Sequence, residues 1–176
     1  CYWGEAWAWG AYLNGTMRTA EAPRAYAAIQ KALERVDQAN DVERALIEAM
    51  AVRYVEEFDP DYRAVQDSAY SKAMRDVADR FPEDLDAVTL YGESLFLLEP
   101  RRGARDVNDP DVAELHRVLE LVLDQDIQHP GACHLYIHAT ESSQEPAKAE
   151  ACSEFLGNAI PGASHINHMP SHTWNV

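Results

Sequence analysis

The sequence has few basic residues, few cysteines and no long apolar run. Lys and Arg total 15 against 30 Asp and Glu, which gives a net charge of −15. A field of this sign repels phosphate backbones and argues against nucleic acid as a partner. A membrane-spanning helix needs about 20 predominantly apolar residues in a row, and no such stretch occurs. With 47% hydrophobic and 26% charged residues, the composition is that of a globular protein.

Most of the short motifs that identify an enzyme are also missing. The three cysteines show no Cys-x-x-Cys spacing, which argues against a zinc site built on thiolates. The zinc-protease pattern HExxH, the phosphate-binding P-loop and GxGxxG patterns, and the serine-hydrolase pattern GxSxG do not occur. The sequence therefore identifies no reaction, and any catalytic role stays open.

Strand signals are scarce, whereas helix starts are frequent. Pro23, Pro110 and Pro146 are placed as first-turn prolines, Asp109 is a typical N-cap before Pro110, and Asp41 is expected to cap another helix. Apolar residues then recur at helical spacing. The expected helices cover residues 2–13, 23–38, 42–57, 61–80, 84–98, 110–127, 131–142 and 146–158, followed by an incomplete one from about 163, with one long loop at 99–110.

Four short segments repeat along the chain. YWGEAWA, LIEAMA, LYGESLF and LYIHATE superimpose when Glu5, Glu48, Glu93 and His138 are aligned. Helix pairs repeated at this spacing are typical of a solenoid, in which each unit stacks on its neighbour. We therefore expect an all-α solenoid of stacked antiparallel helix pairs. It should form a single domain over residues 1–176, incomplete at both ends because helical patterns run up to both termini.

Two stretches resemble a group of bacterial tetratricopeptide-repeat (TPR) proteins. HPGACHLYIHATES (129–142) and PGASHINHMPSH (161–172) are similar to the HPGAxHLYIHA and HMPSH motifs of that group, and CYWGEA at the start is similar to it as well. The resemblance implies a TPR-like fold with a recurring site, and it names no reaction. The repeat spacing is longer than the 34 residues of a standard TPR unit, so the repeat boundaries differ from that pattern.

The same two stretches hold six of the seven histidines, and five of these recur at helical spacing. The first places three groups at i, i+4 and i+7, on one helix face: His134, His138 and Glu141. The second has i, i+3 and i+7 spacing: His165, His168 and His172. Corresponding helices of neighbouring solenoid units lie about 8–10 Å apart, so the two sets can face each other. Pro170 must kink the second segment or start a new helix there.

Imidazole is the commonest protein metal ligand, and mixed histidine and carboxylate sets suit zinc, copper or iron. We therefore expect a transition-metal site. The principal ligands expected are His134, His138, His168 and His172, with Glu141, His165 and Glu93 as further ligands or hydrogen-bond partners. Two alternatives remain open, namely a structural seam of hydrogen-bonded polar groups and a metal-free acid/base site. Isolated histidines such as His116 and His129 are expected to be ordinary structural residues.

Three function classes fit these features: a metalloprotein with catalytic ability, a TPR scaffold that binds peptides or proteins without metal, and a non-catalytic metal carrier or sensor. The aligned column reads Glu, Glu, Glu, His, which suits a cation better than a peptide carboxylate. Fold analogy alone would favour scaffolding. Trp3, Tyr91 and Tyr136 also align, either as core packing or as a wall that holds a small-molecule or peptide ligand beside the metal.

Cys133 and Cys152 lie at similar distances on either side of a turn expected near Ser143. Two antiparallel helices could bring these cysteines together as a disulfide, although two buried free thiols are an equal alternative. A disulfide would indicate an extracytoplasmic location, periplasmic or secreted, because cytosolic thiols stay reduced.

Overall fold

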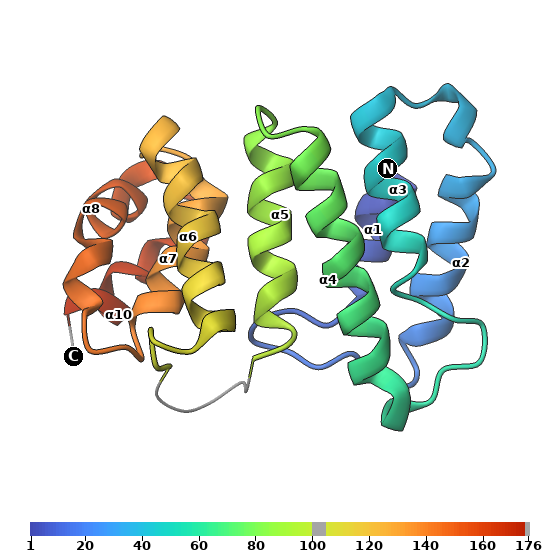
Figure 1. Ribbon diagram of the computed structural model, residues 1–176, viewed down its shortest axis with the longest axis horizontal. Coiled ribbons are helices and arrows are strands. Elements are labelled where there is room, and N and C mark those ends of the chain that lie inside the picture. Colours follow the sequence, from blue (N-terminus) through green and yellow to red (C-terminus); the bar gives the residue numbers. More distant parts are fainter. Residues whose placement is uncertain (100–104, 175–176) are drawn as a thin grey trace. The chain divides into compact units, whose positions relative to one another are not determined.

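The computed structural model describes residues 1–99 and 105–174, and within these ranges the chain is helical (Figure 1). They contain no strand, only an isolated bridge between Tyr12 and Gly15. The expected all-α class is therefore confirmed for this part of the chain. The TPR-like solenoid stays a prediction. Residues 100–104 of the expected loop at 99–110 lie outside the described residues.

The chain divides into two compact units, Cys1–Arg101 and Arg102–Val176. Unit 1 contains five α-helices within its described residues: α1 (Tyr2–Trp9), α2 (Ala22–Leu33), α3 (Asp41–Ala51), α4 (Arg63–Arg80) and α5 (Leu85–Phe96). Short 3-10 turns, η1 (Val36–Gln38) and η2 (Pro60–Tyr62), precede α3 and α4. Each of these α-helices packs on the next one in sequence, and α1 also packs on α3. The single domain over 1–176 stays a prediction.

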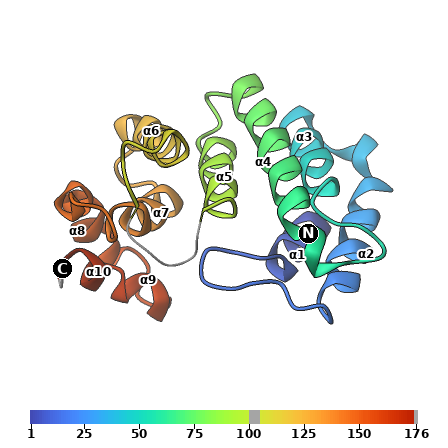
Figure 2. The same cartoon turned by 60° about the horizontal axis from the view of Figure 1, so that its bottom comes forward.

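Unit 2 holds the remaining elements, and Figure 2 shows their arrangement. They are α6 (Pro110–Gln125), α7 (Pro130–Thr140), η3 (Pro146–Ala149), α8 (Glu150–Ala159), α9 (Ser164–His168) and α10 (Pro170–Trp174). Helix α7 packs against α6 and α8, and α10 packs against both α7 and α8. Fully buried apolar side chains, among them Leu115, Leu119, Ile137 and Leu156, form the core of this unit. The short helices α9 and α10 thus lie on a three-helix frame.

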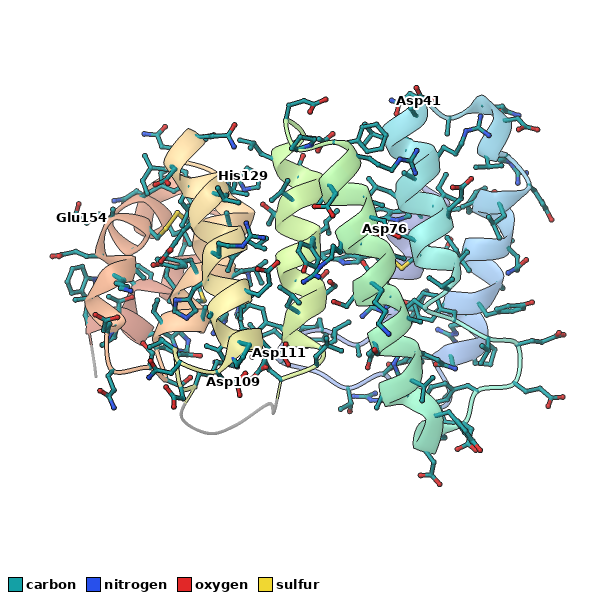
Figure 3. All side chains as sticks on the ribbon, viewed as in Figure 1. Asp41, Asp76, Asp109, Asp111, His129 and Glu154 are labelled. Atoms are coloured by element: carbon teal, nitrogen blue, oxygen red, sulfur yellow. A yellow bond between two sulfur atoms is a disulfide. The ribbon has the colours of Figure 1, made fainter. Side chains whose placement is uncertain are left out.

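The helix starts agree in part with the predicted caps. Asp109 caps α6, because its carboxylate accepts a hydrogen bond from the Asp111 backbone N–H at 2.9 Å (both labelled in Figure 3). The assignment of Asp41 as a cap was wrong by one residue. Asn40 caps α3 and forms a reciprocal capping box with Glu43, and Asp41 is the first helical residue.

Three helices of unit 1 end clearly earlier than predicted, and one of them is α2, which stops at Leu33 rather than near residue 38. Helix α1 stops at Trp9 rather than near residue 13, and α3 stops at Ala51 rather than near residue 57. Both ends meet at Arg53, whose buried guanidinium donates a hydrogen bond to the Ala11 carbonyl. Gly10 lies so close to Arg53 and Tyr54 that a side chain at this position would collide with them. The ends of α1 and α3 therefore lie beside one buried arginine.

Candidate metal centre

Five imidazoles and one carboxylate come together in unit 2, carried by α7, α9 and α10 and by the residue that ends α7. We call this set the histidine cluster: His134, His138, Glu141, His165, His168 and His172. Apart from Glu93, it contains every residue that the sequence predicted for a metal. The two matching sequence stretches thus do face each other.

The start of α7 fixes where the first stretch places its side chains. His129 is the N-cap, and its Nδ1 accepts a hydrogen bond from the Ala132 N–H at 3.1 Å. Pro130 follows at the first helical position, where its missing N–H costs nothing. Starting from this cap, His134 and His138 come one turn apart on the same face, with ring centroids 5.0 Å apart.

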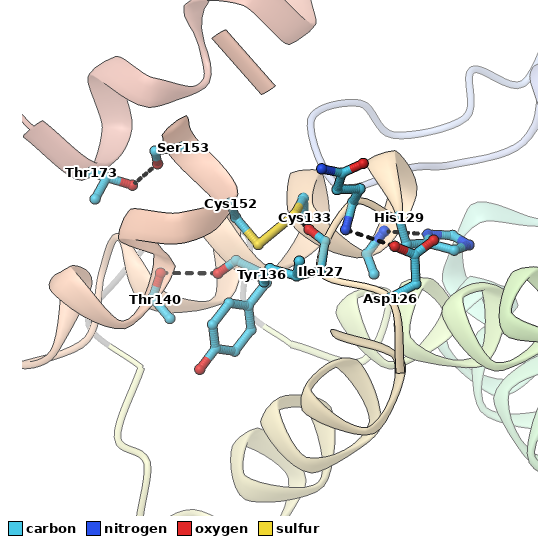
Figure 4. Close-up of a disulfide and its surroundings, with 11 residues drawn as sticks. Asp126, Ile127, His129, Cys133, Tyr136, Thr140, Cys152, Ser153 and Thr173 are labelled. Atoms are coloured by element: carbon cyan, nitrogen blue, oxygen red, sulfur yellow. Dashed lines mark hydrogen bonds between the residues drawn. A yellow bond between two sulfur atoms is a disulfide. The ribbon is translucent and has the colours of Figure 1, made fainter. Parts of the chain in front are cut away.

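A disulfide and a hydroxyl pair hold the second stretch near the first (Figure 4). Cys133 of α7 and Cys152 of α8 are bonded, with Cα atoms 4.9 Å apart, so the expected pairing is confirmed. Ser153 of α8 donates to the Thr173 hydroxyl of α10 at 2.7 Å, and both side chains are buried. Helix α8 therefore connects the two stretches that carry the histidines.

Pro170 lies between His168 and His172 of the second stretch. The structure ends α9 at His168 and starts α10 at Pro170, which is the second of the two outcomes expected for this proline. Even so, the rings of His168 and His172 remain neighbours, with centroids 5.0 Å apart. His168 and His172 therefore stay in contact across the helix break.

The five imidazoles form a closed circuit of neighbours. Successive ring centroids are separated by 5.0 Å (His134 to His138), 5.1 Å (His138 to His172), 5.0 Å (His172 to His168), 4.7 Å (His168 to His165) and 5.0 Å (His165 to His134). The circuit runs from buried to exposed. His138 is 3% exposed, whereas His165 and His168 are exposed to solvent.

Two pairs of ring nitrogens approach each other closely. The Nε2 atoms of His134 and His165 are 3.0 Å apart, and those of His168 and His172 are 3.1 Å apart. Two ligands held at about 2.0–2.1 Å from one ion stand roughly 3.3 Å apart on a tetrahedron and roughly 2.9 Å apart at a right angle. Each pair already has the separation of two ligands on a shared ion.

Glu141 accepts hydrogen bonds from the Nδ1 atoms of two of the rings. Its Oε1 accepts a hydrogen bond from His138 Nδ1 at 2.8 Å, and its Oε2 accepts one from His172 Nδ1. A carboxylate accepts only, so both imidazoles carry a proton on Nδ1, and in the neutral ring Nε2 then presents a lone pair. The Nε2 atom of His138 is buried without a hydrogen-bond partner. This is an unsatisfied acceptor inside a histidine cluster.

Burial and charge in the cluster favour a neutral His134 and a neutral His165 beside a charged Glu141. Burial, and then the neighbouring histidines, lowers the pKa of His134 to about 3. The same two causes lower the pKa of His165. Burial alone would raise the pKa of Glu141, but the hydrogen bond from His138 and the nearby His138 and His172 outweigh it and lower that pKa. Deprotonated histidines and an ionised glutamate are the forms that a metal ion requires.

Two sets of three residues bring one possible ligand atom each within 4.8 Å of one another in the described part of the chain. The first set is His134, His138 and His165, and the second is His138, Glu141 and His172. The sets share only His138. His168 belongs to neither set, yet it lies against His172.

Glu93, the remaining predicted metal residue, lies on α5 in unit 1. Its buried carboxylate accepts a hydrogen bond from Trp7 Nε1 at 2.9 Å. Burial raises its pKa, which Arg53 and the Trp7 hydrogen bond oppose. A role for Glu93 at the metal stays a prediction. The fully buried Arg53 was not foreseen, because a single arginine after an apolar helix carries no distinctive sequence signal.

The three aromatic residues proposed for substrate binding each have structural contacts. Trp3 donates to the Leu46 carbonyl at 3.0 Å and lines a cavity of about 330 Å³ in unit 1. Tyr91 and Tyr136 are almost fully buried. The hydroxyl of Tyr91 accepts from Arg75 at 2.8 Å, and that of Tyr136 donates to Glu120 at 2.6 Å. These contacts favour the packing interpretation for Tyr91 and Tyr136, and the substrate role stays a prediction.

We also considered the chain as a whole, for membrane spans and for similarity to known proteins. Among the described helices, none has both the length and the apolar character needed to cross a membrane. Comparison of the chain with protein-family models, with curated proteins and with solved structures found no match.

Proposed function

We propose that this chain is a metal-binding protein whose histidine cluster holds a transition-metal ion such as zinc, copper or iron. The observation that carries the proposal is the unpaired Nε2 of His138. Glu141 fixes the His138 proton on Nδ1, so a lone pair points into the buried end of the cluster. A divalent cation is a ligand that would satisfy this lone pair and those of the neighbouring rings together.

The two metal-free alternatives account for less of the geometry. A hydrogen-bonded polar seam explains the two close Nε2 pairs, because one ring can donate to the other, but it leaves the His138 acceptor buried and unsatisfied. An acid/base site works best with a pKa close to the operating pH. The pKa of His134, at about 3, is too low for this role near neutral pH.

Within the proposed site, each residue has a distinct task. His134, His138 and His165 would supply nitrogen ligands, and Glu141 would keep His138 and His172 in the correct tautomer and orientation. A bound ion of this kind polarises a substrate oxygen or lowers the pKa of a bound water. The exposed rim at His165 and His168 leaves this side of the cluster open to solvent.

Two wider expectations belong to the same proposal. The disulfide between Cys133 and Cys152 favours an oxidising compartment, so we place the protein outside the cytoplasm. The TPR-like solenoid remains the proposed architecture, on the strength of the repeated segments and the resemblance to TPR proteins. A peptide scaffold without metal is the second candidate function, supported by that resemblance.

Metal analysis of the purified chain tests the proposal directly. The protein is stripped with a chelator, dialysed against Zn²⁺ or Cu²⁺ and then against buffer, and its metal content is measured. We expect at least one ion per chain in the wild type and less than one per chain in the double variant His138→Ala/His172→Ala. His129→Asn is the matched control, because it keeps a side-chain cap on α7 and lies outside the cluster. Metal-free wild type, or full content in the double variant, would refute the proposal.

A second experiment tests whether Glu141 supports the metal site by positioning its histidine ligands. Glu141→Gln keeps the size and one acceptor oxygen but removes the charge. Loss of a carboxylate that orients a ligating histidine commonly lowers metal affinity about 10–100-fold. We therefore expect the variant to retain its stoichiometry with a weaker Kd, as measured by competition with a chelating dye. Unchanged affinity would show that Glu141 does not support the site.

A further inference from the structure

We infer that the histidine cluster binds two metal ions at adjacent positions rather than one. This inference rests on the proposed metal-binding function and concerns how the six residues divide between ions. The first position includes the buried His138, whereas the second has only the half-buried His172 and the exposed His168. Each is defined by a pair of Nε2 atoms already about 3 Å apart.

The first position uses three imidazoles. The Nε2 atoms of His134 and His165 are 3.0 Å apart, and His138 completes a set whose ligand atoms all lie within 4.8 Å of one another. His138 is buried and has the unpaired Nε2. Three histidines with a fourth position left for water or substrate form a common arrangement for catalytic zinc.

The second position uses His168 and His172. Their Nε2 atoms are 3.1 Å apart, and Glu141 holds His172 by Nδ1. The Nε2 atom of His172 therefore faces His168, and Glu141 holds His138 of the first position by Nδ1 in the same way. With two protein nitrogens and an exposed His168, this position leaves more coordination sites for water or for an oxygen-containing ligand.

A single ion does not account for the whole cluster. Two ligands at about 2.0–2.1 Å from one ion can be no more than about 4.2 Å apart. The sets that meet even a 4.8 Å limit share only His138, and His168 is in neither of them. One ion would therefore leave at least one close Nε2 pair unused.

The two positions are neighbours and are connected through one carboxylate. The rings of His165 and His168, one from each position, have the shortest centroid separation in the circuit, at 4.7 Å. Glu141 binds His138 of the first position with one oxygen and His172 of the second with the other. Two ions this close can share a bridging oxygen ligand, as water or hydroxide does in two-metal hydrolytic sites.

The test counts ions per chain in three proteins. The full chain, stripped and titrated with Cu²⁺, should bind two ions, the first more tightly because its position is more buried. His134→Gln/His165→Gln and His168→Gln/His172→Gln should each bind one ion. Glutamine preserves polarity and approximate size, and circular dichroism verifies that helix content is retained. A pair variant that loses its helices is replaced by the single variants His165→Gln and His168→Gln, both at exposed positions.

Electron paramagnetic resonance supplies an independent readout. Two neighbouring Cu²⁺ ions in the wild type should give a coupled or weakened signal, whereas each pair variant should give the signal of an isolated ion. One ion per wild-type chain with an uncoupled signal overturns the two-ion inference and leaves the proposed function standing. No bound ion in the wild type overturns both.

Discussion

Each unit of the chain contains a buried carboxylate or a half-buried one, and the two carboxylates interact with different kinds of side chain. In unit 1, burial raises the pKa of Glu93, and the Arg53 guanidinium and the Trp7 N–H only partly oppose this rise. In unit 2, the groups that lower the pKa of Glu141 are the imidazoles of His138 and His172. Arginine remains charged at any ordinary pH, whereas an imidazole can be neutral and then binds cations.

This difference shows why the histidines, rather than the buried glutamate, predict function. Glu93 already has a permanent cation nearby, so its environment is explained without a ligand. Glu141 instead orients two imidazole rings through their Nδ1 atoms, so their Nε2 atoms face away from the carboxylate. A buried carboxylate alone is thus a weak indicator of a metal site, and the identity of its partner decides how it should be interpreted.

Breaking the unit 1 cluster should have the largest effect on stability. Arg53→Met removes the buried cation near Glu93 and leaves that buried carboxylate with the Trp7 hydrogen bond alone. Leaving a buried charge without a compensating charge typically costs about 3–5 kcal/mol. We expect a loss of that size in the free energy of urea unfolding. Tryptophan fluorescence is suited to this measurement, because Trp3, Trp7 and Trp9 all lie in unit 1.

The double variant Arg53→Met/Glu93→Leu is the matched control. Replacing both charges with apolar groups removes the unpaired carboxylate, so at least half of the lost stability should return. If the double variant is as unstable as Arg53→Met alone, the arginine acts through its packing and its bond to the Ala11 carbonyl rather than through Glu93.

Removing the disulfide of unit 2 should have the next largest effect. Cys133 and Cys152 are 19 residues apart in sequence, and closing a loop of this size stabilises a fold by about 3 kcal/mol in the chain-entropy model. Cys133→Ser/Cys152→Ser should therefore lose about that much, as measured by hydrogen exchange of the α7 and α8 amides. Wild type in reductant should behave like the variant. A wild type that reductant leaves unchanged would contradict a stabilising role for the bond.

Acid should destabilise the metal-free histidine cluster. The folded-state pKa of His134 is about 3, against an ordinary value of 6.5, so between these values only the unfolded chain binds the proton. Stability contributed by this group is complete above pH 6.5 and is lost as the pH falls toward 3. One proton corresponds to a slope of up to about 1.4 kcal/mol per pH unit. Urea unfolding at several pH values, with chelator present, measures it.

His134→Gln and His129→Asn provide the comparison for this slope. The first variant removes the group whose pKa is lowered, so its stability should depend less on pH between 4 and 6. The second retains His134 and should keep the wild-type slope. Equal slopes in the two variants would show that His134 is not the group responsible.

Much of the fold was predictable because helix starts depend on local chemistry. Asp109 and Pro110 mark the start of α6 through interactions within one turn of the chain. The early ends of α1 and α3 were not predictable, because they depend on Arg53 reaching the Ala11 carbonyl from 42 residues away. Contacts of that range leave no periodic pattern in the sequence.

The candidate site was predictable to a similar extent. Helical spacing placed His134, His138 and Glu141 on one face, and the repeated motif indicated that the second stretch lies beside it. The division of the rings into two Nε2 pairs was not foreseen, because it depends on side-chain rotation and on the break at Pro170. Sequence spacing thus identifies which residues meet, and the structure identifies which atoms face each other.

The smallest expected effect concerns the capping box of α3 in unit 1. Asn40→Ala removes the side-chain oxygen that accepts the Glu43 N–H at 2.9 Å, and loss of such a cap costs about 1 kcal/mol. Asn40→Asp, which preserves the cap, should restore stability in the same urea titration. Metal content should match the wild type in both variants, because the histidine cluster belongs entirely to unit 2. Reduced metal content in the folded Asn40→Ala protein would show that the site depends on unit 1 as well.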